Sequence, residues 1–253
     1  MPFTFAHPAI ILPFGRLPNK WFSWTGLIVG ALVPDFEYFI RFRVLSVYSH
    51  TIGGLFWFDL PLAIVIAFVF HAAVRSVLFN NLPDPLWRRL SLFDQFNWPR
   101  YFSRNWHVVV ISILIGAASH LFWDAFTHSA GYFVQACPAL SNEVPVFGFG
   151  VPVFKVLQHT SSVLGGSAVL ITLIMLPIHD QPEKKMNRRY WPIVITLAAV
   201  ITLLTAALGH VPIGNVIVSA ISGTLIGLIV AGTLIGRRAG NRTDGGAAGT
   251  HST

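Results

Sequence analysis

Long apolar segments alternate with short polar stretches along the chain, and six of the apolar segments have the length of a membrane-crossing helix. They cover residues 21–40, 53–74, 107–127, 160–178, 192–208 and 212–236. A helix of about 20 residues crosses the roughly 30 Å hydrocarbon core of a bilayer. Pro34 and Asp35 interrupt the first segment. The pattern predicts an all-α fold, a polytopic helical membrane bundle of about five or six spans.

The composition supports this class. Hydrophobic residues make up 54% of the chain and charged residues 11%, and the mean hydropathy is +0.64. Soluble domains usually carry about 25% charged residues, so this chain has too little polar surface for water. We expect a single helical membrane domain over 1–238 and a disordered tail over 239–253, which is rich in Gly and Thr. The first residues have no basic start and no cleavage site, so we expect mature sequence rather than a signal peptide.

The basic residues predict an orientation. If all six segments cross, 14 of the 17 Lys and Arg residues fall on one side of the membrane. The positive-inside rule makes that side cytoplasmic. Both termini then lie in the cytoplasm, and the chain is a multi-pass protein of the cell inner membrane. If the first segment does not cross, the N-terminus lies outside instead. Because the net charge of +7 follows from this use of basic residues, we expect membrane lipids as partners and no nucleic-acid partner.

The third apolar segment carries His120, Asp124 and His128 at intervals of four residues. An ionisable side chain inside a bilayer costs roughly 2.5 kcal/mol or more, so these three need a compensating interaction. Residues i, i+4 and i+8 of a helix differ in direction by only about 80°, so one cleft can receive all three. Imidazole and carboxylate are zinc ligands, and the spacing indicates a metal site. The alternative is a polar trio hydrogen-bonded to other helices.

If all six segments cross the membrane, further candidate metal ligands lie at the same membrane depth. They are Asp35, His50 and His159, each near one end of an apolar segment. Independent placement would scatter such residues over both faces, so the coincidence favours one site towards the outer face. His7 precedes the first segment and falls on the cytoplasmic side if that segment crosses. It joins the others only if residues 1–20 fold back or the segment does not cross.

Several motifs together carry a resemblance to a known family. They are "MPFTFAHPA", "GALVPDFEYF", "LFWFDLP", "SHLFWDAFTH" and "LQHTSSVLGG". From residue 1 to about 235 the chain resembles domain of unknown function family 4184, a family of bacterial membrane proteins. That family is similar to membrane-bound metal-dependent hydrolases. More remotely it resembles the helical superfamily of zinc-dependent phospholipase C and the single-strand nucleases.

The superfamily resemblance implies a three-zinc site. It assigns Asp35, His50, His120 and Asp124 to the first metal, His128 and His159 to the second, and His7 with Asp124 to the third. This chain departs from the superfamily pattern in two respects. It has no visible cleavage signal after Met1, and Val163 stands where the last carboxylate ligand is expected. We therefore expect a divalent metal cofactor, zinc, with one or two ions bound.

Such a site predicts a membrane-embedded metal-dependent hydrolase. Zinc supplies a water-derived nucleophile at neutral pH, and the expected substrate is a phosphate ester such as a lipid or another phosphodiester. We expect Asp124 to bridge two metals and Asp35 or Glu37 to orient the attacking water, with Glu37 the general base by elimination.

The alternative is a non-enzymatic polytopic protein or a transporter. In a transporter, Asp59, His71, His120 and Asp124 would form a proton relay. A carrier of this kind typically has inverted repeats, and we find none in the sequence.

Overall fold

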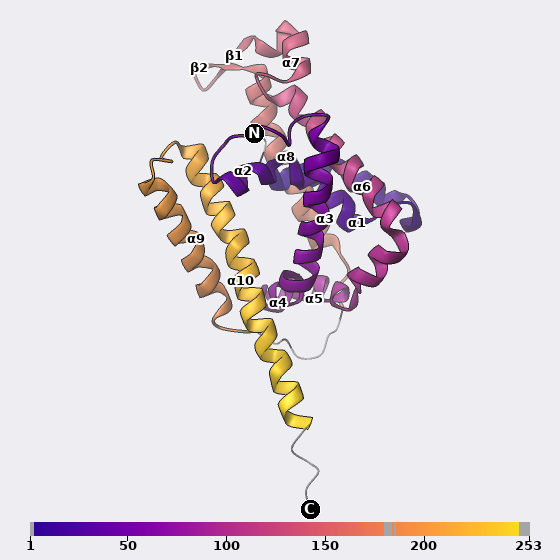
Figure 1. Ribbon diagram of the computed structural model, residues 1–253. Coiled ribbons are helices and arrows are strands. Elements are labelled where there is room, and N and C mark those ends of the chain that lie inside the picture. Colours follow the sequence, from indigo (N-terminus) through magenta and orange to yellow (C-terminus); the bar gives the residue numbers. More distant parts are fainter. Residues whose placement is uncertain (1–2, 180–183, 185, 248–253) are drawn as a thin grey trace, which may run out of the picture. The chain divides into compact units, whose positions relative to one another are not determined.

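A computed structural model describes residues 3–179, 184 and 186–247 of the protein, and helices dominate it (Figure 1). The chain gathers into two compact units, each assembled from segments that are distant in sequence. The first unit contains Met1–Glu37, Ser46–Ala67 and Pro99–Met175. The second contains Tyr38–Leu45, Phe68–Trp98 and Leu176–Thr253.

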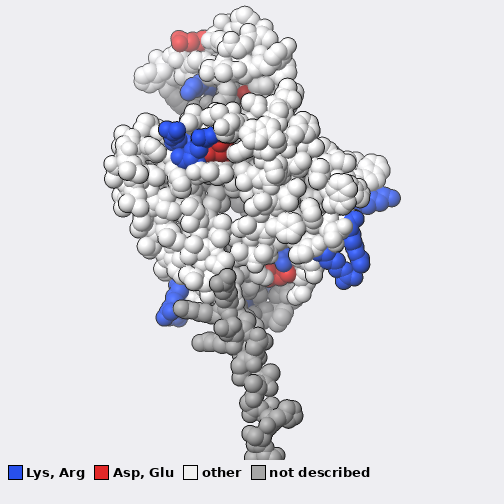
Figure 2. Space-filling model, viewed as in Figure 1, with Lys and Arg blue, Asp and Glu red and all other residues white. Residues whose placement is uncertain are grey.

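Five helices among the described residues are long and apolar enough to cross a membrane. They are Leu55–Asn81, Trp98–Ala136, Val153–Met175, Tyr190–Ala207 and Ile213–Gly236. They correspond to the second to sixth apolar segments of the sequence, so the predicted helical membrane fold is confirmed. Most of the face shown in Figure 2 carries neither Lys, Arg, Asp nor Glu, which fits a surface in contact with hydrocarbon.

The first apolar segment does not form a sixth crossing helix. It is divided into α1 (Trp24–Leu32), the 3-10 turn η3 (Val33–Asp35) and α2 (Phe36–Arg41). Pro34 has no backbone N–H to donate and disfavours a helical residue before it, which explains the break. The nine residues of α1 rise only about 13 Å, less than half the hydrocarbon thickness. The described residues therefore contain five crossing helices, the lower of the two predicted numbers.

The first unit is built around one long helix. This is α6 (Trp98–Thr127), which has a kink at Asn105. The chain before it forms η1 (Thr4–Arg16), η2 (Asn19–Trp21), α1, η3, η4 (Leu55–Asp59) and α3 (Leu60–Val69). After it come α7 (Tyr132–Ala136), η7 (Pro138–Ser141), β1 (Glu143–Val146), β2 (Phe149–Pro152) and α8 (Val153–Met175). The two strands form an antiparallel hairpin, and η1 packs against both α1 and α8.

The second unit is centred on two of the crossing helices. Here α9 (Tyr190–Ala207) packs along α10 (Ile213–Ala247), with Tyr190, Val194 and Ala231 in their shared core. The unit also contains η5 (Phe70–Val74), α4 (Arg75–Asn81), α5 (Asp84–Leu90) and η6 (Ser91–Gln95). The predicted domain boundary at residue 238 falls inside α10. The end of the predicted tail, residues 248–253, lies outside the described residues.

Candidate metal centre

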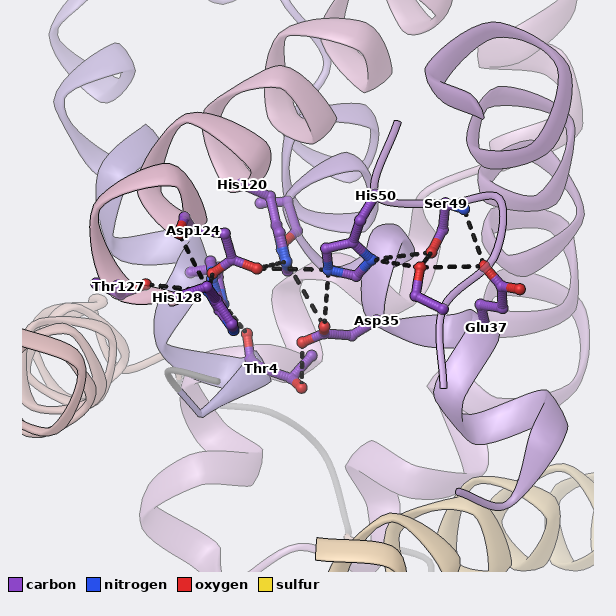
Figure 3. Close-up of polar contacts among 12 residues, drawn as sticks. Thr4, Asp35, Glu37, Ser49, His50, His120, Asp124, Thr127 and His128 are labelled. Atoms are coloured by element: carbon purple, nitrogen blue, oxygen red, sulfur yellow. Dashed lines mark hydrogen bonds and ion pairs between the residues drawn. The ribbon is translucent and has the colours of Figure 1, made fainter. Parts of the chain in front are cut away.

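Two imidazoles and two carboxylates of the first unit converge on one point (Figure 3). The Nε2 atoms of His50 and His120 each lie 3.4 Å from Oδ2 of Asp124. The same two nitrogens each lie 3.6 Å from Oδ1 of Asp35. Asp35 and His120 are completely buried and Asp124 is nearly so. Four side chains from η3, α6 and the loop before η4 therefore surround one small volume.

The four nitrogen–oxygen distances match a tetrahedral metal site. Zinc bonds of about 2.0–2.2 Å require neighbouring ligand atoms about 3.3–3.6 Å apart. Three buried ligand atoms form no hydrogen bond with the described part of the chain: Asp35 Oδ1, His120 Nε2 and Asp124 Oδ2. Each such atom costs about 1–3 kcal/mol if nothing compensates it. A cation at the centre would satisfy all three, so the cluster fits a divalent metal.

Hydrogen bonds outside the cluster orient both rings. His120 Nδ1 lies 2.8 Å from the carbonyl oxygen of Ala31, which can only accept, so Nδ1 carries the proton. His50 Nδ1 lies 3.0 Å from the hydroxyl of Ser46, whose own proton is donated to Glu37. In both rings the Nε2 lone pair consequently points at the carboxylates. Histidines that bind metals are usually held in this way by a partner on the other ring nitrogen.

The second oxygen of Asp124 faces two further histidines. Its Oδ1 lies 3.3 Å from His7 Nε2 and 3.5 Å from His128 Nδ1. His7 donates from Nδ1 to the carbonyl of Thr4, at 3.2 Å, and its ring stacks on His120 with centroids 3.7 Å apart. Ligand atoms of His7, Asp35 and His120 all lie within 4.8 Å of one another. Asp124 thus presents Oδ2 to His50 and His120 and Oδ1 to His7, as a bridging ligand would. His128 Nδ1 donates its proton to the backbone carbonyl of Asp124, at 3.1 Å.

The crossing of α1 and α6 brings these residues together. A Cβ atom on Gly30 would overlap the carbonyl oxygen of Ile113, and one on Gly116 would overlap that of Leu27. Only glycine lets the two backbones approach this closely, and the approach lets Ala31 reach His120. The chain then turns at η3, which carries Asp35 into the cluster.

The N-terminal 3-10 helix η1 supplies a partner for the remaining carboxylate oxygen. The hydroxyl of Thr4 donates to Oδ2 of Asp35 at 2.5 Å. Oδ1 of Asp35 is thereby left to face the histidines. The structure thus places the N-terminal segment, including His7, at the cluster, as expected if the first apolar segment does not cross.

Glu37 has a different position from the one expected of a general base. Its carboxylate accepts hydrogen bonds from the backbone N–H groups of residues 47–49, at 2.9–3.0 Å, and from the hydroxyl of Ser46 at 3.3 Å. Four donors occupy this buried carboxylate, which therefore holds the loop that presents His50. We assign Glu37 a positioning role in place of the expected proton transfer.

The structure brings together six of the predicted ligands but not the seventh. The six are His7, Asp35, His50, His120, Asp124 and His128. The side chain of His159 is exposed on α8. At this level α8 turns Gln158 inward and His159 outward. Matching membrane depth placed His159 in the site, but depth does not specify which face of a helix a residue occupies.

The residues of the relay alternative do not all join the cluster. Asp59 is completely buried in the first unit, and neither oxygen of its carboxylate forms a hydrogen bond with the described residues. His71 belongs to the second unit, where its ring stacks on Trp98 with centroids 4.8 Å apart. Its Nδ1 lies 2.8 Å from Nη1 of Arg75. His71 therefore has a structural setting of its own.

Several residues that shape the site have no strong signal in the sequence. Ala31 contributes only a backbone carbonyl, and Thr4 and Ser46 contribute single hydroxyls. Hydroxyl residues are common in loops and at helix ends, so neither could be selected from its position alone.

Comparison with known proteins identifies the family of the chain. The family model described as "Domain of unknown function (DUF4184)" matches residues 1–233. Comparisons with curated proteins and with solved structures find no match.

Proposed function

The chain belongs to the DUF4184 family, and from the geometry of its buried cluster we propose that it is a membrane-embedded, metal-dependent hydrolase of phosphate esters. One observation carries the proposal. Nε2 of His50 and His120 and one oxygen each of Asp35 and Asp124 lie at the spacing of tetrahedral zinc ligands. Both rings are held by Nδ1 with the Nε2 lone pair directed inwards.

The donor set favours zinc, with one or two ions. Two imidazole nitrogens and two carboxylate oxygens suit zinc better than the softer metals that prefer thiolates. A bound zinc ion supplies a nucleophile from water at neutral pH and stabilises charge on a phosphoryl oxygen. Asp124 faces His7 with its second oxygen, so these two residues would help to hold a second ion if one binds.

Neighbouring residues of the chain hold the proposed metal ligands in place. Thr4 fixes the Asp35 carboxylate, Ala31 fixes the His120 ring, and the loop held by Glu37 fixes His50. The side chains of His50 and His128 are 20% and 30% exposed, whereas those of His7 and His120 are fully buried. The cluster is therefore open to its surroundings on the side of His50 and His128. The proposed substrate is a lipid or another phosphodiester, because the site lies in a membrane protein.

We infer that the site faces the outer side of a bacterial inner membrane. Five crossings place the two termini on opposite sides, and the basic clusters near residues 88–89 and 184–189 mark the cytoplasmic side. A reporter active only outside the cytoplasm should then be active when fused after residue 140 and inactive after residue 95. Activity of both fusions, or of the second alone, would overturn this orientation.

Metal removal tests the hydrolase. Protein purified in detergent should carry about one or two zinc ions and hydrolyse bis(p-nitrophenyl) phosphate. Chelation should abolish the hydrolysis and added zinc should restore it, because the nucleophile depends on the metal. The variant His120→Ala should lose both metal and activity. His159→Ala, which changes an exposed histidine, should lose neither.

Two results would count against the proposal. Hydrolysis that survives full chelation would exclude a metal mechanism. Stoichiometric metal without any phosphodiesterase activity would leave a structural metal site in a non-enzymatic protein.

A further inference from the structure

A cavity of about 420 Å³ in the first unit leads to the cluster. Its walls come from η1, α6 and α8, and they include His7, Trp123, Leu157, Leu164 and Ala168. Ligand pockets typically measure about 300–1,000 Å³. The cavity is thus large enough for part of a ligand, and it lies beside residues that already belong to the candidate metal centre.

One end of the cavity opens towards lipid. Leu157 and Leu164, both on its wall, are 40% and 65% exposed. They lie on α8, a helix of crossing length of which only 6% of the most apolar stretch is buried. In a membrane the surface of such a helix contacts acyl chains. The cavity is therefore a groove that hydrocarbon can enter sideways from the bilayer.

The other end of the groove stops at the cluster. His7 is buried and lines the groove, and its Nε2 lies 3.3 Å from Oδ1 of Asp124. Trp123, the neighbour of Asp124 on α6, forms part of the same wall. The groove therefore ends at a histidine that contacts the bridging carboxylate of the candidate metal centre.

The lining of the groove is mostly apolar, which favours an apolar ligand. None of the lining residues is Lys, Arg, Asp or Glu, and Ser161 already donates its hydroxyl proton to the carbonyl of Gln158 at 3.0 Å. Small residues, Ala6 and Gly165 among them, also line the groove. A Cβ atom added at Gly165 would lie 2.8 Å from the carbonyl oxygen of Ala6, so η1 and α8 are in close contact there.

We propose that this groove binds one hydrocarbon chain of a membrane amphiphile whose phosphorylated head group is positioned at the cluster. The position of the head group rests on the hydrolase function proposed above, whereas the tail site rests on the groove alone. The substrate would then be a lipid that enters the site without leaving the membrane, not a water-soluble phosphodiester.

Photo-crosslinking in vesicles tests the tail site. The protein is reconstituted in phosphatidylglycerol that includes a fraction with a diazirine at the end of one acyl chain. After irradiation, mass spectrometry should find label on η1 between Ala6 and Ile10, in the wild type and in the control Ser167→Phe, whose position is exposed and outside the groove. The groove-filling variant Ala168→Phe should lower this label by at least about tenfold, because an apolar pocket discriminates by about that factor per methylene group.

A second groove variant, Ala9→Phe, fills the same space from the opposite wall and should give the same loss. Equal labelling of η1 in all variants would overturn the tail site. An unlabelled η1 together with crosslinks between two copies of the chain would also overturn it, because a second copy would then cover the groove.

Hydrolysis of bis(p-nitrophenyl) phosphate, which has no acyl chain, separates the two proposals. If the variants show the expected labelling but the wild type does not hydrolyse this compound, the tail site is supported and the hydrolase function is excluded. If hydrolysis is normal and all variants are labelled equally, only the tail site is excluded.

Discussion

The variant Asp124→Asn is expected to lose bound metal and to hydrolyse phosphodiesters more than about 100-fold more slowly than the wild type. Loss of a partner that merely orients a metal ligand typically costs 10–100-fold in metal affinity or activity, and Asp124 is a proposed ligand itself. Asparagine keeps the volume of the side chain but removes the charge opposite His7, His50 and His120. Metal analysis and hydrolysis rates on the same detergent preparation measure both effects.

A matched control uses a carboxylate outside the cluster. Asp84 is exposed in the second unit and pairs with Lys184 at 2.7 Å. Asp84→Asn should keep full metal content and activity. If Asp124→Asn retained metal as tightly as Asp84→Asn does, Asp124 would not be a ligand, and hydrogen bonding among neutral groups would explain the cluster.

The second large effect is expected from Gly116→Ala. The added methyl group would overlap the carbonyl oxygen of Leu27 on α1, so α1 and α6 must move apart. Overpacking typically costs about 1–3 kcal/mol, and here it also separates Ala31 from His120. We expect a lower thermal midpoint and a loss of metal although every proposed ligand is still present.

Gly166→Ala provides the control for this change. A Cβ atom at Gly166 on α8 meets nothing within 4 Å. Alanine should leave stability unchanged or raise it by up to about 1 kcal/mol, because it is the better helix former. A Gly116→Ala variant as stable as Gly166→Ala, with normal metal content, would show that the close contact of α1 and α6 does not build the site.

Much of the fold follows from the sequence because the membrane imposes simple requirements. Length and hydropathy located the five crossing helices, since every backbone polar group in lipid must be satisfied inside a helix. Pro34 marked the break in the first segment for an equally local reason. The four-residue spacing of His120 and Asp124 placed both on one face of α6, as the period of a helix requires.

The points that the sequence left open or assigned differently depend on contacts between distant segments. The position of His7 follows from η1 packing on α1 and α8, and helical periodicity says nothing about such packing. Glu37 and His159 were selected by residue type and membrane depth. Glu37 accepts hydrogen bonds from the backbone of a loop, and His159 lies on the exposed face of α8, so neither takes the expected role.

X-ray absorption at the zinc edge of the purified protein measures the coordination of the proposed metal. We expect zinc with four nitrogen or oxygen neighbours at about 2.0–2.2 Å, including the outer-shell scattering that imidazole rings produce. The variant His120→Ala, which is expected to lose the metal, should give no zinc signal. A purified, folded wild-type protein that holds no metal and takes up none when zinc is supplied would show that the buried cluster is not a metal centre.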